Sequence, residues 1–139
     1  MIDAPIRMHG FPPSCVKYLR TFPRSLKSMN LAPNVSERIR DCLVALIHPS
    51  KIIVFGSYAR GQATAASDID IAAIAGDGQP HDRETRIRSR QALRRALKDA
   101  NLAFDFVLES KETFDRERRK AGSFEHAIDS EGVVIYEQR

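Results

Sequence analysis

The chain has 139 residues, of which 42% are hydrophobic, and its formal net charge is +4 at pH 7. This length suits one compact domain and leaves little room for a second. The sequence has no apolar run of the roughly 18 residues that a membrane-spanning helix needs, and prolines interrupt its N-terminal stretch, so we expect a soluble cytoplasmic protein that is not bound to a membrane.

The first 33 residues are rich in proline and basic residues and show neither helical nor strand periodicity, so we expect mostly irregular structure there. Met29 stands just ahead of the first clear helical pattern. This position favours the hypothesis that residues 1–28 are an extension or a mobile arm and that Met29 is a natural start. We therefore divide the chain into an irregular N-terminal extension, residues 1–33, and a single domain, residues 34–139.

A helix and a strand are predicted at the start of this domain. Apolar residues recur at helical spacing from residue 35 onward, Ser36 is a suitable N-cap, and Pro49 ends the pattern. Residues 51–55 then form a short β-branched and apolar run, which is typical of a strand buried on both faces. Gly56 ends this strand.

The next strand and helix carry opposite charges. Residues 68–74 begin by alternating aspartate with isoleucine, which places Asp68 and Asp70 on one face of a strand. After a glycine-rich turn, residues 83–100 keep helical spacing. A basic stripe runs along the outside of this predicted helix, made of Arg83, Arg90, Arg94 and Lys98. By default such a stripe is a solvated face.

The remaining residues continue the alternation of strand and helix. Residues 102–108 form a third apolar strand, interrupted by Asp105. Helices are predicted over residues 111–120 and 123–130, the second capped by Ser123, and a last strand covers residues 133–136. This order predicts an α/β fold.

The glycine-serine pair after the first strand is suited to binding phosphate. Gly56 lets the main chain approach a ligand closely, and Ser57 can donate both its hydroxyl and its amide to phosphate oxygens. If Ser57 opens a helix, the unpaired N–H groups of the first turn add affinity for anions. Arg60 is either a further phosphate contact or a surface residue.

Three carboxylates supply hard oxygen ligands. Asp68 and Asp70 can share a divalent cation, and Mg²⁺ favours carboxylates combined with substrate phosphates. Asp105, on a separate strand, could complete the cluster, although edge strands also carry lone charges that prevent association. Three converging carboxylates would repel one another without a cation, so the pattern points to a magnesium site.

Taken together, these motifs resemble those of a known family. Gly56-Ser57, followed after ten residues by Asp68-x-Asp70 and later by a strand with Asp105, is similar to the signature of the DNA polymerase β-type nucleotidyltransferase superfamily. The form Gly-Ser-Tyr-Ala-Arg-Gly before Ser-Asp-Ile-Asp-Ile resembles its minimal nucleotidyltransferase branch. The resemblance extends from about Val35 to the C-terminus.

This resemblance implies both a fold and a set of roles. The fold is a small mixed β-sheet of about four strands flanked by helices. Asp68, Asp70 and Asp105 would hold two Mg²⁺ ions, with Asp105 also activating the acceptor hydroxyl. Gly56 and Ser57 would hold the β- and γ-phosphates of ATP. The implied reaction is in-line attack on the α-phosphorus with loss of pyrophosphate.

The same resemblance suggests an acceptor. Larger relatives add a second domain that holds the acceptor, so we expect a protein partner here. Minimal nucleotidyltransferases are similar to the antitoxins of two-gene systems whose toxin is a helical HEPN ribonuclease. This implies transfer of AMP from ATP to a tyrosine of that toxin, within a hetero-oligomer.

Two alternatives remain open. The chain could be a non-catalytic binding module that neutralises a toxin by covering it, although such a module does not need the carboxylate cluster. It could also be a stand-alone transferase that acts on a small molecule or an RNA end, with the basic stripe of residues 83–98 as its nucleic-acid contact. Direct nucleic-acid binding is the less favoured interpretation.

Overall fold

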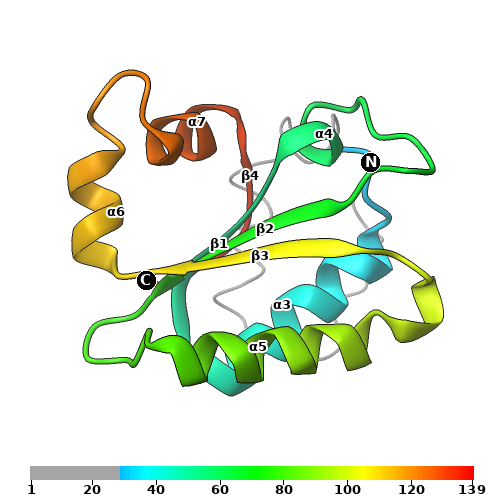
Figure 1. Ribbon diagram of the computed structural model, residues 1–139, viewed down its shortest axis with the longest axis horizontal. Helices are drawn as coiled ribbons and strands as arrows, with labels where there is room; N and C mark the ends of the chain where they lie inside the picture. The colour runs from blue at the N-terminus through cyan, green and yellow to red at the C-terminus, as the bar shows by residue number, and fades with distance from the viewer. Residues whose placement is uncertain (1–28) are drawn as a thin grey trace.

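A four-stranded sheet with helices on both faces forms the centre of the protein (Figure 1). The computed structural model describes residues 29–139. Its strand order is β3-β2-β1-β4, with β1 antiparallel to both of its neighbours and β2 parallel to β3. The strands are β1 Pro49–Phe55, β2 Ile69–Ala75, β3 Phe104–Glu109 and β4 Val133–Glu137. The expected α/β fold with a small mixed sheet of about four strands is confirmed.

The predictions for residues 1–28, including an extension ahead of Met29, lie outside the described residues.

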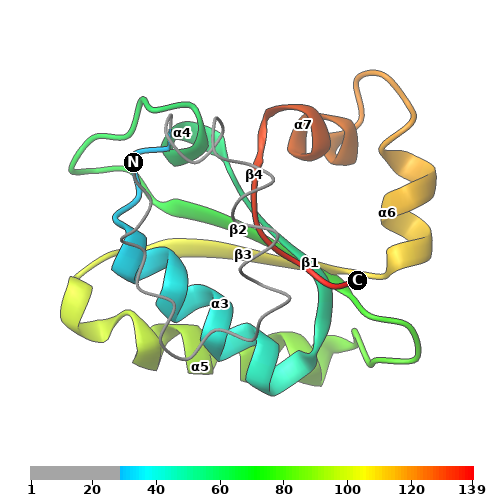
Figure 2. The same ribbon diagram turned by 180° about the vertical axis from the view of Figure 1, so that it is seen from behind.

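The larger part of the core lies between the sheet and two long helices, α3 (Pro33–Ile47) and α5 (Arg83–Ala96), seen from behind in Figure 2. Alternate side chains of β2 point into this layer, because successive residues of a strand face opposite sides of the sheet. Ile69, Ile71 and Ala73 are completely buried there. None of the helices within residues 29–139 is long and apolar enough to cross a membrane.

Helix α3 begins earlier than the sequence pattern suggested. Ala32 occupies the N-cap position without a side-chain hydrogen bond, and Pro33 opens the helix. Proline suits this position because its fixed φ is helical and its missing N–H would have no partner there. Ser36, the predicted cap, lies inside the first turn and donates its hydroxyl to the carbonyl of Pro33 at 2.9 Å. The helix ends at a left-handed His48.

Helix α5 is shorter than the predicted range of residues 83–100. Asp82 caps its start by accepting a hydrogen bond from the amide of Thr85 at 3.0 Å. After Leu97 the chain tightens into the 3₁₀ helix η1, Lys98–Ala100, which ends at a left-handed Asn101. The two helical segments are therefore followed by a sharp turn into β3.

Three short helices cover the opposite face of the sheet: α4 (Gly56–Ala59), α6 (Lys111–Glu117) and α7 (Phe124–Glu131). A second, smaller buried cluster lies beneath α6 and α7 and consists of Ile53, Ala72, Ile74, Phe114 and Ile128. The predicted cap is confirmed, since Ser123 accepts a hydrogen bond from the amide of His126 at 2.9 Å.

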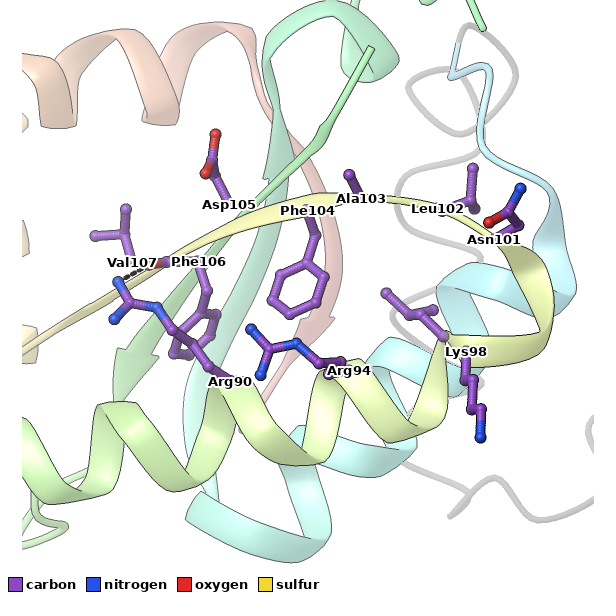
Figure 3. Close-up of a pocket in the computed structure, with 11 residues that line it drawn as sticks. Arg90, Arg94, Lys98, Asn101, Leu102, Ala103, Phe104, Asp105, Phe106 and Val107 are labelled. Atoms are coloured by element: carbon purple, nitrogen blue, oxygen red, sulfur yellow. Dashed lines mark hydrogen bonds between the residues drawn. The ribbon is translucent and has the colours of Figure 1, made fainter. Parts of the chain in front are cut away.

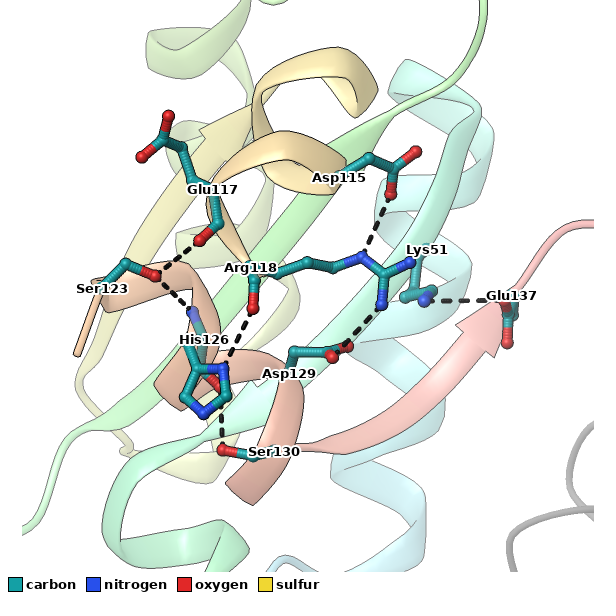
Figure 4. Close-up of polar contacts among 9 residues, drawn as sticks. All are labelled: Lys51, Asp115, Glu117, Arg118, Ser123, His126, Asp129, Ser130 and Glu137. Atoms are coloured by element: carbon teal, nitrogen blue, oxygen red, sulfur yellow. Dashed lines mark hydrogen bonds and ion pairs between the residues drawn. The ribbon is translucent and has the colours of Figure 1, made fainter. Parts of the chain in front are cut away.

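Polar contacts centred on Arg118 join α6 to α7 (Figure 4). Its guanidinium lies 3.4 Å from a carboxylate oxygen of Asp115 and 3.3 Å from one of Asp129. Its carbonyl lies 3.0 Å from Nδ1 of His126. These contacts fix the angle between two helices that are each too short to be stable alone.

Glu109, at the end of β3, carries a strongly perturbed carboxylate. One of its oxygens is buried without a hydrogen-bond partner. Burial raises its pKa to about 8, and Glu125 and Glu117 contribute further through their contact and charge. Glu109 therefore holds a proton over a pH range in which an exposed glutamate is ionised.

Replacing Phe114 should reveal how much the smaller cluster stabilises the fold. Phe114→Ala should lower the free energy of unfolding by about 3–5 kcal/mol, because Phe114 is only 1% exposed and its loss leaves a cavity. Phe124→Ala is the matched control, with an expected loss of about 1 kcal/mol, since Phe124 is 50% exposed and keeps one edge-to-face contact. Urea denaturation measures both values, and equal losses would contradict the assigned core.

Glu109 should make stability depend on pH. The folded protein holds this proton up to about pH 8, whereas the unfolded chain releases it near the ordinary glutamate pKa of 4.5. The folded state therefore binds more protons between these values, and its stability falls as pH rises through them. Glu109→Gln should resist urea better than wild type at about pH 9, with the difference shrinking toward about pH 5. The exposed Glu112→Gln variant should track wild type at both pH values.

Candidate functional site

Strand pairing brings two of the predicted aspartates together. Asp70 on β2 is the register partner of Asp105 on β3, and it also lies opposite Phe55 at the end of β1. Because Ile69 and Ile71 point into the main core, Asp70 points to the other face, which carries α6 and α7. Figure 3 shows Asp105 likewise directed away from α5. The two carboxylates thus share one face of the sheet.

Asp68 lies just before β2, two residues from Asp70, and is exposed. Burial raises the pKa of Asp70, and the negative charges of Asp105 and Asp68 raise it further, whereas the positive charge of Arg60 opposes them. Asp105 and Asp68 therefore both lie close enough to Asp70 to act on it electrostatically. Side-by-side carboxylates destabilise a sheet, so this arrangement favours a bound cation over an edge-protecting role for Asp105.

Gly56 lies directly against this cluster. It is the first residue of α4 and has a left-handed φ of 73°, and a Cβ at this position would overlap the carboxylate of Asp70. Glycine is therefore required both by the backbone angle and by the close approach of β1 to Asp70. Ser57 follows within the same turn, and its hydroxyl makes no hydrogen bond to another residue of the described part of the chain.

Arg60 lies at the edge of the site on the surface. Its guanidinium contacts the side chains of Gln62 at 3.3 Å and Glu131 at 3.6 Å, and its side chain is 45% exposed. It nevertheless lies close enough to lower the pKa of Asp70. Both predicted roles, phosphate contact and surface residue, are compatible with this position, and the phosphate contact stays a prediction.

The donor set suits magnesium bound together with a substrate. Within residues 29–139 no three His, Cys, Asp or Glu side chains are arranged to hold a metal ion by themselves. Mg²⁺ commonly uses one or two carboxylates and completes its shell with water and phosphate oxygens. Asp68, Asp70 and Asp105 offer only oxygen ligands, and a cation would offset both the burial and the neighbouring negative charges that raise the pKa of Asp70. The residues present therefore fit an open magnesium site.

An aromatic residue that the sequence analysis did not single out stands beside this site. The ring of Phe124, in the first turn of α7, meets the ring of Phe55 edge to face, with centroids 5.7 Å apart. Phe55 immediately precedes Gly56, and half of Phe124 is exposed. The sequence feature that could have pointed to Phe124 is a phenylalanine among polar residues at the start of a short predicted helix.

Comparisons with known proteins agree with this geometry. Residues 37–139 match the family described as "Polymerase beta, Nucleotidyltransferase". The chain belongs to this nucleotidyltransferase family. The resemblance inferred from Gly56-Ser57 and Asp68-x-Asp70 is thereby confirmed at the level of the family. No curated protein matches the chain significantly.

Solved structures place this nucleotidyltransferase near toxin–antitoxin proteins. One similar structure is described as a toxin–antitoxin with AMP-PNP; it is 25% identical, with a TM-score of 0.55 and coverage of 75% of this chain and 74% of that chain. Another is a mutant of the toxin–antitoxin MntA-HpeT; it is 21% identical, with a TM-score of 0.53 and the same coverage. The second likeness establishes the fold alone.

The close approach of Gly56 to Asp70 can be tested with a matched pair of glycines. Gly78→Ala should cost about 1–2 kcal/mol of stability, because φ is 74° there but a Cβ would meet no atom within 4 Å. Gly56→Ala should cost about 1–3 kcal/mol more, since the methyl group also displaces the Asp70 carboxylate. Urea denaturation compares the two variants, and equal losses would show that Asp70 can move aside freely.

Proposed function

We propose that this nucleotidyltransferase transfers AMP from ATP to a protein acceptor, a tyrosine of a HEPN-type ribonuclease toxin, and so acts as its antitoxin. The observation that carries the proposal is the pairing of Asp70 with Asp105 on one face of the sheet, next to Asp68 and Gly56. Family membership supports the reaction class. The similar toxin–antitoxin structure with AMP-PNP supports the nucleotide and the kind of partner.

In the proposed reaction the tyrosine oxygen attacks the α-phosphorus of ATP, and the bond from that phosphorus to pyrophosphate breaks. Asp105 accepts the proton of the attacking hydroxyl, a role that its position on an exposed edge strand permits. Asp68 and Asp70 would hold two Mg²⁺ ions together with Asp105. When bound, these ions supply positive charge that stabilises the entering and leaving oxygens.

The phosphate end of ATP is proposed to lie at the start of α4. Gly56 lets the main chain approach Asp70 closely, and the Ser57 hydroxyl, which makes no hydrogen bond within residues 29–139, would donate one to a phosphate oxygen. Arg60 would exchange its surface contact with Glu131 for a phosphate. Such an exchange costs little, because exposed ion pairs contribute about 0–1 kcal/mol. The catalytic domain in this proposal is residues 34–139, following an N-terminal extension.

Two properties of the carboxylate cluster argue against a pure binding module. Burial and the neighbouring carboxylates raise the pKa of Asp70, and only glycine at position 56 accommodates the Asp70 carboxylate. A module that only covers a toxin would be more stable without either feature. A transferase acting on a small molecule or RNA end would use the same cluster, so the acceptor must be identified by experiment.

Labelled ATP tests the proposed reaction. The protein, mixed with the product of its neighbouring gene, Mg²⁺ and ATP labelled on the α-phosphate, should transfer label to a tyrosine of the partner. Asp70→Asn should lower the rate by about 100-fold or more, because it removes a carboxylate that would hold the Mg²⁺ ions whose positive charge stabilises the transition state. Asp77→Asn, an exposed aspartate beyond the far end of β2, is the matched control and should leave the rate unchanged.

Two outcomes would contradict the proposal. Tight partner binding without label on any protein, unchanged in Asp70→Asn, would identify a binding module. Label on RNA or a small molecule with none on the partner would retain the transferase and reject the protein acceptor.

A further inference from the structure

A cavity of about 880 Å³ follows the outer edge of β3 and ends at the candidate site (Figure 3). Its lining combines cationic side chains of α5 and η1 with residues of β3. Among them are Arg90, Arg94, Lys98, Phe104, Asp105 and Val107. The cavity therefore runs from a predicted catalytic carboxylate to a basic surface. We call it the β3-edge groove.

The floor of the β3-edge groove is a strand edge. Within residues 29–139 β3 is the last strand of the sheet on this side, so no strand of this described part neighbours its outer main-chain groups. Arg90 donates a hydrogen bond to the carbonyl of Phe106 at 3.2 Å, which shows that this carbonyl faces the groove and can accept a donor. An unpaired strand edge can accept an added strand from another chain.

The charges of the groove are unbalanced. Arg90, Arg94 and Lys98 are exposed, and none of them forms an ion pair with a carboxylate of residues 29–139. Arg90 and Arg94 approach the edge from the α5 side of the sheet, whereas Asp105 points to the opposite side (Figure 3). The groove thus has a basic rim on one side and a carboxylate on the other.

We propose that the β3-edge groove binds an extended acidic segment of the partner protein, which pairs with β3 and presents the acceptor hydroxyl to Asp105. This inference rests on the proposed function, because it assigns a docking position to its acceptor. Successive side chains of a strand point to opposite faces. A hydroxyl directed toward Asp105 would therefore be flanked by two side chains directed toward Arg90 and Arg94, which acidic residues would complement.

An added peptide fits the groove better than single-stranded RNA does. A peptide strand can donate a main-chain N–H to the edge carbonyl of Phe106. A phosphate backbone has no N–H group that could do the same. Proteins that hold single-stranded RNA stack its bases on exposed aromatic rings. The two aromatic residues that line the groove, Phe104 and Phe106, are instead turned toward α5, where Phe104 packs on the main core and Phe106 is buried in it.

Peptide binding without nucleotide tests the groove separately from catalysis. The probes are two fluorescein-labelled seven-residue peptides, Thr-Val-Glu-Tyr-Glu-Val-Thr and its counterpart with lysine in place of both glutamates. Fluorescence anisotropy should show at least about tenfold tighter binding of the acidic peptide, because each charge-assisted contact contributes more than a neutral one. Equal affinities, or no binding of either peptide, would overturn the inference.

Charge reversal locates the binding surface. Arg90→Glu/Arg94→Glu should weaken acidic-peptide binding by about tenfold or more. The control Arg83→Glu/Arg88→Glu changes the net charge equally at exposed positions of the same helix outside the groove, and it should bind nearly as wild type. Equal weakening in both variants would mean that overall charge, rather than the groove, attracts the peptide.

Strand pairing itself is tested by N-methylation of the peptide. A peptide that adds to β3 directs alternate N–H groups toward it. Methylation at one of two neighbouring positions should therefore abolish binding and methylation at the other should not. Equal effects at both positions would exclude strand addition. A 12-nucleotide single-stranded RNA is the competing ligand. If it bound more tightly than the acidic peptide, and if that binding depended on Arg90 and Arg94, the groove would be an RNA site rather than a peptide site.

The two proposals can fail independently. Peptide binding that persists without any AMP transfer would contradict the proposed function and leave the docking groove intact. Transfer of AMP to the partner that is insensitive to Arg90→Glu/Arg94→Glu would contradict the groove and leave the transferase intact.

Discussion

The repulsion between Asp70 and Asp105 is the constraint on which the candidate site depends. Parallel pairing of β2 and β3 makes these residues register partners on one face of the sheet, and Asp68 adds a third charge from just before β2. Burial of Asp70 and these two charges together raise its pKa, and the charge of Arg60 opposes them. The packing of the remaining structure must therefore hold these carboxylates in place against their own electrostatics.

That support comes from the opposite face of the same strand. Ile69 and Ile71 flank Asp70 along β2, and both are completely buried beneath α3 and α5. A slip of one residue would turn the isoleucines to solvent and bury the aspartate, so the register is strongly specified. The hydrophobic core thus fixes the position of the charges, and Gly56 completes the fit by leaving out the one atom that would overlap Asp70.

Much of this arrangement could be predicted from the sequence, because it follows local periodicity. The two-residue period of β2 separated Asp68 and Asp70 from the isoleucines, and the succession of helices and strands along the chain followed the alternation of patterns. The register of Asp105 could not be predicted, since it depends on which strand lies beside β2. Helix ends were also missed: Pro33 opens α3 in place of Ser36, because tertiary packing and a favourable φ outweigh a side-chain cap.

The position of β3 links chemistry to recognition. An edge strand exposes unpaired main-chain groups, which proteins commonly protect with charges. Here Arg90 covers one edge carbonyl of β3, while Asp105 on the same strand faces the site. A further strand built permanently into the sheet would remove this exposure but would also occupy the approach to Asp105. An open edge next to a predicted proton acceptor therefore allows a second molecule to complete the sheet and supply the reacting group in one step.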